Sequence, residues 1–392
     1  MNMPFTAVPI EDDQSEATFS APSFDELIVT EDELNAAKLT PKCIAENHTY
    51  ADVAQLIAPG GTGKTTIILY ELIHIALGRD VWGCKVINPG WSLIVTAEDR
   101  REQLLARMRE ILNAMDLTPD ERLKAISSIR IWDVTGEQQK LVFVANGMVQ
   151  LTNLADNIIE AHKNNPPAVI IFDPLVSFGA SEQKINDNEQ ALITAARRIV
   201  RSLDCCVRYV HHTGKGNARD KALDQYAGRS GSAMPDGTRM TFVLHSWEEG
   251  DQLKPPPGCR SDRHSSITML ARPKLSYAKP NLPIIWIKRN GFRFEHFTEL
   301  YQTTEQKAAS LANQVHQFLT HELKQGKHYT KSNLDTKVDL LGMTRKDLRA
   351  AIADLEITER VMDTELPKEQ RQGKRKTFLK PIPPSNDDTR AD

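Results

Sequence analysis

A glycine-rich segment organises this chain. It reads Ala58-Pro59-Gly60-Gly61-Thr62-Gly63-Lys64-Thr65-Thr66. The apolar run at 53–57 predicts a strand before it, and the apolar positions of 67–73 suit one face of a helix after it. Because glycine carries no Cβ, successive backbone N–H groups of the loop can turn toward an anion at the positive end of that helix. The segment therefore predicts a phosphate-binding loop between a strand and a helix.

The loop follows the P-loop pattern G-x-x-x-x-G-K-[ST], with Ala58 at the position of the first glycine. Lys64 would reach the β- and γ-phosphates of a nucleotide, and the Thr65 hydroxyl would hold Mg²⁺ against them. The residues expected to contact the nucleotide are Pro59, Gly60, Gly61, Thr62, Gly63, Lys64, Thr65 and Thr66. The alternative, a β–α turn that binds nothing, explains neither the Lys-Thr pair nor its context.

Length and composition predict a globular protein of two or three domains. The chain has 392 residues, of which 40% are hydrophobic, so a sizeable core can form. Its formal net charge of −3 shows no basic excess over the whole chain, and any surface for nucleic acid must therefore be local. The five cysteines show no C-x-x-C spacing, which favours a reducing cytoplasm over a disulfide framework or a zinc site. We find no secretory leader and no apolar run of the ~20 residues that span a bilayer, so we expect no membrane association.

The first 40 residues predict a disordered acidic leader. Residues 1–35 contain nine acidic residues and no lysine or arginine. A short partner helix is the alternative, since Phe24, Leu27, Ile28 and Leu34 are apolar. At the other end of the chain, residues 382–392 predict a disordered tail.

Residues 41–304 alternate apolar strands with helical stretches. Strands are expected at 91–97, 168–173 and 206–210, and a long helix at 189–203. Such alternation predicts an α/β domain whose mainly parallel sheet is covered by helices on both faces. Ligands of these sheets bind at the carboxyl ends of the strands, so the polar residues that follow the strands should lie in one place.

Two acidic residues follow strands in this domain. Asp173 suits the Mg²⁺ contact expected of a Walker B carboxylate, with an ordinary Asp-Pro turn as the alternative. Because no second acid follows Asp173, the catalytic base must come from elsewhere, and Glu98 is the nearest candidate to polarise the attacking water. The alternative is that Glu98 and Asp99 only cap the helix that begins at Arg100, a role that we expect for Asp99.

Several motifs together resemble the RecA-like ATPases of the plasmid RepA hexameric helicase type. They are, in order, the loop 58–65, Thr96-Ala97-Glu98-Asp99, Arg107, Ile171-Phe172-Asp173, Val210-His211-His212 and Gly228-Arg229-Ser230-Gly231-Ser232. The resemblance covers roughly residues 50–300 and implies a RecA-like P-loop core that uses ATP and Mg²⁺. It also implies Glu98 as the catalytic base and His212 as a sensor of the γ-phosphate, with a solvated turn as the alternative for the paired histidines.

The same resemblance implies residues that act between subunits. The segment 229–239 is similar to the family's segment that leads to its arginine finger, so Arg239 would reach the site of a neighbouring subunit. The alternative is an ordinary arginine at the start of a strand. Tyr277 and Arg107 would flank the adenine by stacking, and Lys274 would support the finger. These roles imply a homo-oligomer, and the family's form is a hexamer.

A basic loop follows the paired histidines. It contains Lys215, Arg219 and Lys221, at the place where hexameric motors point loops into their channel. We expect these three residues to grip the phosphates of a single DNA strand, with a solvated flexible loop as the alternative. The segment 248–263 predicts an insertion between strands.

Residues 305–381 predict a small winged helix-turn-helix domain. Helices are expected at 308–323, from 330 and at 343–352, where Thr344 is the expected cap, and two strands around a basic turn follow. The candidate DNA contacts are Arg345, Lys346 and Arg349 on the third helix and Lys374, Arg375 and Lys376 on the wing. Protein contacts are the alternative use of this fold. The RepA-type helicases lack such an appendage, so the exact subgroup stays open.

Together these features predict an ATP-hydrolysing, ring-forming motor that acts on single-stranded DNA. The most specific form of this prediction is a replicative helicase of a plasmid, phage or other mobile element. The alternative is a nucleotide-switched, DNA-binding regulator that does not translocate. The two differ in whether Glu98 and Arg239 support fast turnover. A small-molecule kinase with the same loop is disfavoured, since no second acceptor pocket is indicated.

Overall fold

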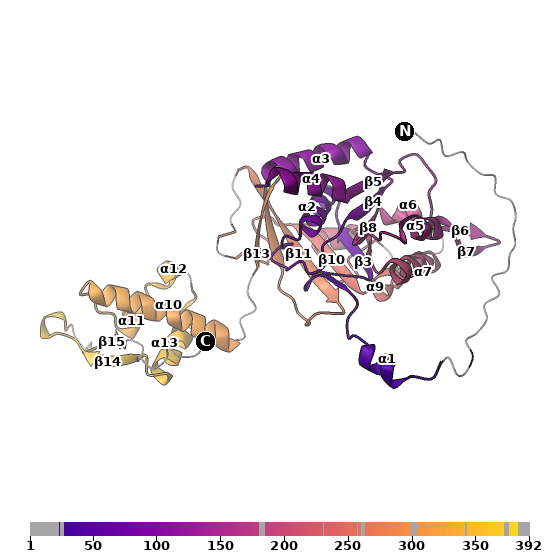
Figure 1. Ribbon diagram of the computed structural model, residues 1–392. Helices are drawn as coiled ribbons and strands as arrows, with labels where there is room; N and C mark the ends of the chain where they lie inside the picture. Colours follow the sequence, from indigo (N-terminus) through magenta and orange to yellow (C-terminus); the bar gives the residue numbers. More distant parts are fainter. Residues whose placement is uncertain are drawn as a thin grey trace. The chain divides into compact units, whose positions relative to one another are not determined.

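The computed structural model describes residues 23, 27–179, 185–229, 231–256, 258–259, 263–298, 304–341, 343–371 and 376–382 (Figure 1). Its helices are α1 (Glu31–Ala36), α2 (Lys64–Leu77), α3 (Arg101–Ala114), α4 (Pro119–Ser128), α5 (Leu154–His162), α6 (Leu175–Phe178), α7 (Ile185–Leu203), α8 (Lys215–Arg219), α9 (Ala233–Gly237), α10 (Thr304–Lys324), α11 (Lys331–Leu334), α12 (Val338–Leu341), α13 (Arg345–Ile357) and the 3₁₀ turn η2 (Lys368–Gln370). Its strands are β1 (Cys43–Ala45), β2 (Thr49–Tyr50), β3 (Val53–Ala58), β4 (Ser92–Thr96), β5 (Ile129–Asp133), β6 (Val142–Ala145), β7 (Met148–Leu151), β8 (Val169–Asp173), β9 (Cys206–His212), β10 (Met240–Ser246), β11 (Ser265–Leu275), β12 (Ile285–Asn290), β13 (Arg293–Thr298), β14 (Val361–Glu365) and β15 (Thr377–Pro381).

The main sheet places the glycine-rich loop at its centre. Within the described part of the chain it has nine strands in the order β13-β12-β11-β10-β3-β9-β8-β4-β5. The pairs β10–β3, β3–β9, β9–β8, β8–β4 and β4–β5 are all parallel, which confirms the predicted mainly parallel α/β sheet. Strand β3, which leads into the loop, therefore lies between β10 and β9, both far from it in sequence. The carboxyl ends of six parallel strands meet at one edge.

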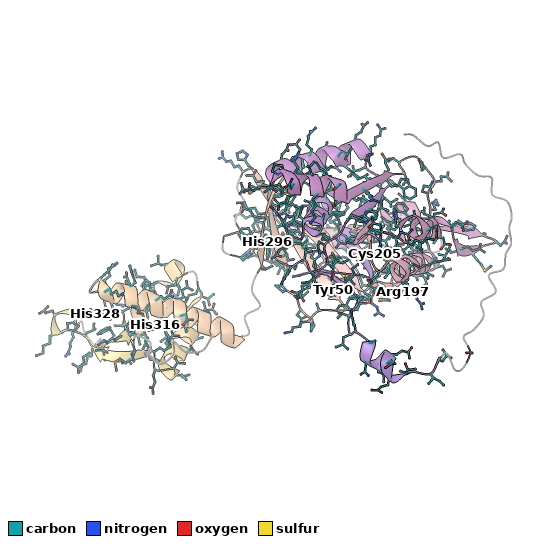
Figure 2. The ribbon with its side chains drawn as sticks, viewed as in Figure 1. Tyr50, Arg197, Cys205, His296, His316 and His328 are labelled. Carbon is teal, nitrogen blue, oxygen red and sulfur yellow. The ribbon has the colours of Figure 1, made fainter. Side chains whose placement is uncertain are left out.

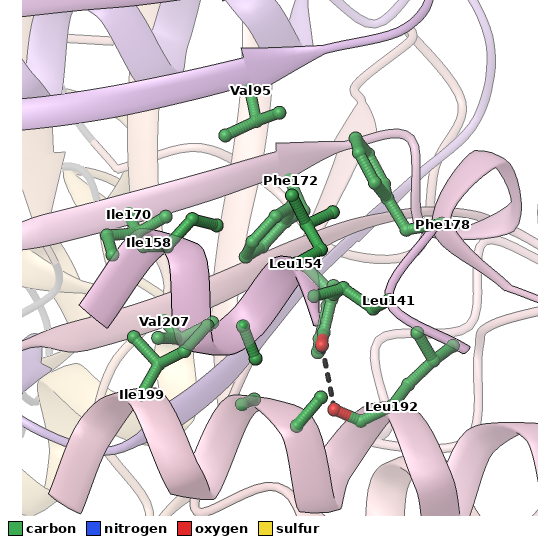
Figure 3. Packing of buried hydrophobic residues seen from close by; sticks show 14 of the residues in the cluster. Val95, Leu141, Leu154, Ile158, Ile170, Phe172, Phe178, Leu192, Ile199 and Val207 are labelled. Atoms are coloured by element: carbon green, nitrogen blue, oxygen red, sulfur yellow. Dashed lines mark hydrogen bonds between the residues drawn. The ribbon is translucent and has the colours of Figure 1, made fainter. Parts of the chain in front are cut away.

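One face of this sheet is covered by α5, α6 and α7 (Figure 3). In β8, Ile170 and Phe172 belong to the buried cluster on this face, whereas Ile171 between them does not. This alternation follows from the two-residue period of a strand. From β9, the Tyr209 hydroxyl donates a hydrogen bond to the carbonyl oxygen of Leu192 on α7, at 2.7 Å. The helix is thus fixed to the strand that ends at His212.

The opposite face carries α2, α3 and α4, and α2 packs against both α3 and α4 (Figure 1). A buried polar cluster joins α2 to β9 here. The Arg208 guanidinium donates to Glu71 Oε2 at 2.6 Å, and the Trp82 indole N–H donates to Glu71 Oε1 at 2.8 Å. Burial alone would raise the pKa of Glu71, but Arg208 and then His48 outweigh it and hold that pKa at about 2. The helix of the phosphate loop is therefore anchored by a buried ion pair.

Three local predictions need correction. Within the predicted disordered leader, Glu31–Ala36 forms a helix that starts with a capping box at Thr30 and buries none of its residues. Residues 1–22 and 24–26, which include Phe24, lie outside the described residues. The basic loop is in part helical, because Lys215–Arg219 forms α8. Helix α3 begins at Arg101 and its N-cap is Arg100, so Asp99 is not the cap.

The chain forms two compact units. One contains the described residues up to Ser246 together with Arg272–Pro280 and Arg289–Phe294. The other contains the described residues of Trp247–Ala271, Asn281–Lys288 and those from Glu295 onward. No described helix is long and apolar enough to cross a membrane.

Helices α10, α11, α12 and α13 of the second unit are followed by the antiparallel hairpin β14–β15. Their apolar cluster includes Val315, Leu319, Leu348 and Leu379. Thr344 Oγ1 accepts the Asp347 N–H at 3.1 Å and caps α13, as predicted. The expected three helices and hairpin are present, with α12 in addition. Whether this module is a DNA-binding winged helix remains a prediction. Residues 383–392 lie outside the described part.

Candidate nucleotide site at the carboxyl edge of the sheet

The loop between β3 and α2 is closed by its own hydrogen bonds. Thr62 Oγ1 donates to the carbonyl oxygen of Pro59 at 2.9 Å, and Lys64 Nζ donates to the same oxygen at 3.2 Å. Gly61 and Gly63 have φ values of 78° and 86°, in the left-handed region that favours glycine. Gly63 is also the N-cap of α2, so Lys64, Thr65 and Thr66 form the first turn of that helix. The loop thus places its N–H groups at the positive end of a helix of 14 residues.

The strand-terminal polar residues gather beside this loop. In the sheet register, Ala58 pairs with His212, and Thr96 pairs with Asp173. His212 Nε2 lies 3.9 Å from Glu98 Oε2. The side chain of Glu98 is 55% exposed, so its carboxylate can meet solvent or a ligand. This confirms the expectation that the residues following the strands lie in one place.

The turn that presents Glu98 is shaped by a residue that sequence reasoning missed. Thr96 Oγ1 donates to the carbonyl oxygen of Asp99 at 3.1 Å and accepts the N–H groups of Asp99 and Glu98 at 3.1 and 3.4 Å. A threonine at the end of a strand can close such a turn, so the signal was present in the sequence. Asp99 forms an ion pair with Arg107 on α3. Arg107 therefore lies at the carboxyl edge of the sheet, the edge next to the predicted phosphate-binding loop (below, the phosphate edge). It is held there by the Asp99 carboxylate.

Burial and neighbouring charges shift the pKa values of Asp173 and Lys64 at this edge of the sheet. Asp173 is 3% exposed, and its Oδ1 has no hydrogen-bond partner among the described residues. Burial and then the charge of Glu98 raise the pKa of Asp173 to about 7, with Lys64 opposing them. Burial lowers the pKa of Lys64, and Asp173 and Glu98 oppose that shift. A buried carboxylate oxygen without a partner, close to a second carboxylate, fits a hard divalent cation such as Mg²⁺.

The two histidines at the end of β9 differ in exposure. Burial lowers the pKa of His211 to about 4, with smaller effects from His212 and Arg229. Burial and the charge of Lys64 also lower the pKa of the half-buried His212, and Glu98 opposes them. The His212 carbonyl oxygen accepts the Arg229 N–H at 2.8 Å. The His212 ring is therefore shifted toward its neutral form, and its backbone is fixed between the loop strand and segment 228–229.

Arg239, Lys274 and Tyr277 lie at the opposite edge of the sheet. The Arg239 N–H donates to the carbonyl oxygen of Val53, the first residue of β3, at 2.9 Å. Lys274 Nζ donates to the carbonyl oxygen of Pro235 at 2.7 Å. The Tyr277 hydroxyl donates a hydrogen bond to Asp52. The centroid of the Tyr277 ring lies 5.3 Å from that of Tyr50, a residue labelled in Figure 2. Within one chain, Tyr277 and Arg107 thus lie at opposite ends of the strands and do not flank one adenine.

A buried carboxylate holds the segment that leads to Arg239. Glu189 on α7 accepts the N–H groups of Gly231 and Met234 at 3.1 and 2.9 Å. A Cβ on Gly231 would lie 1.9 Å from Asn186 Oδ1, so a side chain here would require Asn186 to move. Sequence reasoning missed Glu189, because nothing local relates it to a segment more than 40 residues away.

The candidate DNA contacts lie on both units. Arg219 ends α8 and is exposed, Lys221 follows the helix, and the Lys215 side chain lies outside the described residues. On α13, Arg345, Lys346 and Arg349 are exposed, and Arg349 donates to Asp335 Oδ2 at 2.9 Å. The expected wing residues are Lys374 and Arg375, outside the described residues, and Lys376, which is exposed.

A Gly-Lys-Thr loop at the carboxyl edge of a mainly parallel sheet defines a P-loop NTPase fold. The sequence model of the AAA domain family matches residues 20–218, more than half of the chain, and the chain belongs to this family.

Two solved structures are similar at a distance. One is an ATPase domain that is 13% identical, with a TM-score of 0.46, over 70% of this chain and 99% of that chain. The other is a DnaB-like replicative helicase, solved to show its interactions with primase, which is also 13% identical, with a TM-score of 0.46, over 67% of this chain and 65% of that chain. Likenesses at this level assign no activity.

Proposed function

We propose that this chain is an ATP-hydrolysing motor that forms a ring and acts on single-stranded DNA. The supporting observation is the gathering of Lys64, Glu98, Asp173 and His212 at one edge of the sheet, with Arg239 exposed at the other edge of the same unit. The first four residues supply what phosphoryl transfer to water requires, and Arg239 supplies a cation that a neighbouring copy could receive.

Each residue at the phosphate edge has a distinct role in this proposal. Lys64 and the N-terminus of α2 bind the phosphate chain. Thr65 and Asp173 hold Mg²⁺, which neutralises charge on the phosphates when it is bound. Glu98 takes the proton of the attacking water, since the Thr96 turn fixes the backbone that presents its exposed carboxylate. His212, 3.9 Å from that carboxylate, donates a hydrogen bond toward the γ-phosphate.

The two edges favour a site shared between copies. Arg239 and Lys274 lie at the amino ends of β3 and β10, and Glu189 holds the segment before Arg239. A cation at the amino edge of one copy can complete a nucleotide site at the carboxyl edge of the next, and such head-to-tail contacts close into rings. Arg239 is the arginine finger of this proposal, with Lys274 supporting it and Tyr277 facing the neighbour's adenine.

DNA would be held at two places. Arg219, Lys221 and Lys215 lie in the segment that follows His212 directly, and the pairing of Thr213 with Gly228 closes this segment at its base. Loss of the γ-phosphate on hydrolysis would therefore be transmitted from His212 directly to the basic segment that binds the DNA phosphates. The exposed basic residues of α13 would bind duplex DNA. The sharpest version of the proposal is a replicative helicase of a mobile element, assembled as a hexamer.

A nucleotide-switched DNA-binding regulator is the second candidate, favoured by the exposed basic face of α13. ATPase rates with and without single-stranded DNA of increasing length separate the two. A motor should be stimulated, whereas a lack of stimulation at every length would exclude translocation. In the same assay Glu98→Gln should bind ATP but lose ~10²–10⁴-fold in rate. Hydrolysis by this variant at the parent rate would show that Glu98 is not the base.

A further inference from the structure

The end of the β12–β13 hairpin folds back over the helix of the phosphate loop. In the sheet, β12 is separated from β3 by β11 and β10. Nevertheless, the ring of Phe294 lies 4.7 Å from that of Tyr70 on α2 and 5.9 Å from that of Trp82. These contacts lie within the first compact unit, to which Arg289–Phe294 belong. The hairpin residues therefore reach the vicinity of the loop.

Arg289 is the residue of this hairpin that meets the loop. Its Nη1 lies 3.1 Å from the position that a Cβ on Gly63 would occupy. Its Nε donates to the carbonyl oxygen of Gly291 at 2.6 Å, and the guanidinium lies 5.2 and 5.7 Å from the ring centroids of Phe292 and Phe294. The guanidinium is thus fixed at one end and packed on aromatic rings, beside the N-cap of α2.

Within the described part of the chain, the charge of Arg289 has no carboxylate partner. No ion pair among the described residues includes it, although its side chain is half-buried. Burial lowers the pKa of Arg289 most, and the nearby cation Arg107 lowers it further, as expected of two like charges close together. Lys64 and the positive end of α2 add to the same region. Asp99 pairs with Arg107, and Asp173 and Glu98 lie close to Lys64, whereas Arg289 has no carboxylate partner among the described residues and can pair with a phosphate oxygen.

We propose that Arg289 contacts the phosphate chain of the nucleotide bound by its own P-loop. It is then a cation supplied in cis, in addition to Lys64, and distinct from the arginine of a neighbouring copy. Its planar fork suits two phosphate oxygens at once, and the aromatic rings hold it in place before the nucleotide binds. This inference rests on the proposed nucleotide site.

The test measures the affinity of the whole chain for Mg·ATP, Mg·ADP and inorganic triphosphate by calorimetry. Arg289→Met keeps the packed stem and removes the charge, and Arg289→Lys keeps the charge without the fork. We expect Arg289→Met to weaken both ATP and triphosphate by a similar factor of about 10–100, the range for hydrogen bonds to charged groups, and Arg289→Lys to recover part of the loss. Arg293→Met, which changes an exposed arginine on the same hairpin, is the matched control and should bind as the parent does.

Four results would overturn the inference. If Arg289→Met binds all three ligands as tightly as the parent does, Arg289 does not contact the phosphate chain. If Arg289→Met loses affinity for ATP but not for triphosphate, Arg289 contacts the base and not the phosphates. Equal losses for Arg289→Met and Arg293→Met, or a lowered unfolding temperature that accounts for the loss, make the effect structural. Failure of the parent itself to bind ATP would instead refute the proposed function, and is seen in the same titration.

Discussion

Replacing Glu71 by glutamine tests how far the phosphate-loop helix depends on its buried anchor. Glu71 and Arg208 have side chains only 2% and 1% exposed, with a 2.6 Å bond between them, and Arg208 Nε has no partner among the described residues. Glutamine keeps an oxygen for the Trp82 N–H but leaves the guanidinium charge uncompensated. Removing one partner of a buried ion pair costs about 3–5 kcal/mol. For a unit of this size that corresponds to a fall of roughly 10 °C in the unfolding midpoint.

The assay is thermal and urea unfolding of the full chain, followed by tryptophan fluorescence because Trp82 reports on this cluster. The double variant Glu71→Met/Arg208→Met is the control. An apolar pair of similar volume should recover most of the stability that Glu71→Gln loses, because neither charge is then buried alone. A loss below about 1 kcal/mol for Glu71→Gln, or a double variant less stable than the single one, would refute the assignment of the anchor.

Three further predictions concern pH, the metal and a helix cap. The folded pKa of Glu71, about 2, lies below its ordinary value of 4.5, so its stabilisation should be complete above pH 4.5 and be lost as the pH falls toward 2. Glu71→Gln should lack this part of the acid dependence in unfolding curves from pH 6 to pH 3, and identical slopes would contradict the shift. Asp173→Asn should still bind ATP but lose about 10–100-fold in Mg²⁺-dependent ATPase rate, whereas parent-like activity would exclude it as a metal contact. Thr344→Ala should destabilise the C-terminal module by about 1 kcal/mol in calorimetry, with Thr358→Ala at the other end of α13 as control, and no difference between them would argue against the cap.

The elements that position the phosphate edge could be predicted from the sequence because their signals are local. The apolar runs before Glu98 and Asp173 and the Gly-Lys-Thr loop each lie within about ten residues, and strand-end geometry then brings them together. The helices and the hairpin of the C-terminal module (residues 305–381) could be predicted from the same local patterns of apolar residues.

Side-chain pairs distant in sequence could not be predicted in this way. Arg208 and Glu71 are 137 residues apart, and a strand arginine between apolar neighbours gives no sign of its partner. Arg289 meets the loop only because the hairpin folds over α2. Asp99 had the sequence position of a cap, but it pairs with Arg107 instead, since Arg100 occupies the N-cap. In each case tertiary packing selects among choices that the local sequence leaves open.

The shared nucleotide site is tested most directly by mixing two inactive variants. Lys64→Ala lacks the phosphate-binding lysine and Arg239→Ala lacks the finger, so each alone should be inactive. In rings of randomly mixed copies, about one interface in four joins an intact loop to an intact finger, and the mixture should regain roughly a quarter of the parent ATPase rate. A mixture as inactive as its components, or full activity of Arg239→Ala alone, would contradict a site built from two copies of this chain.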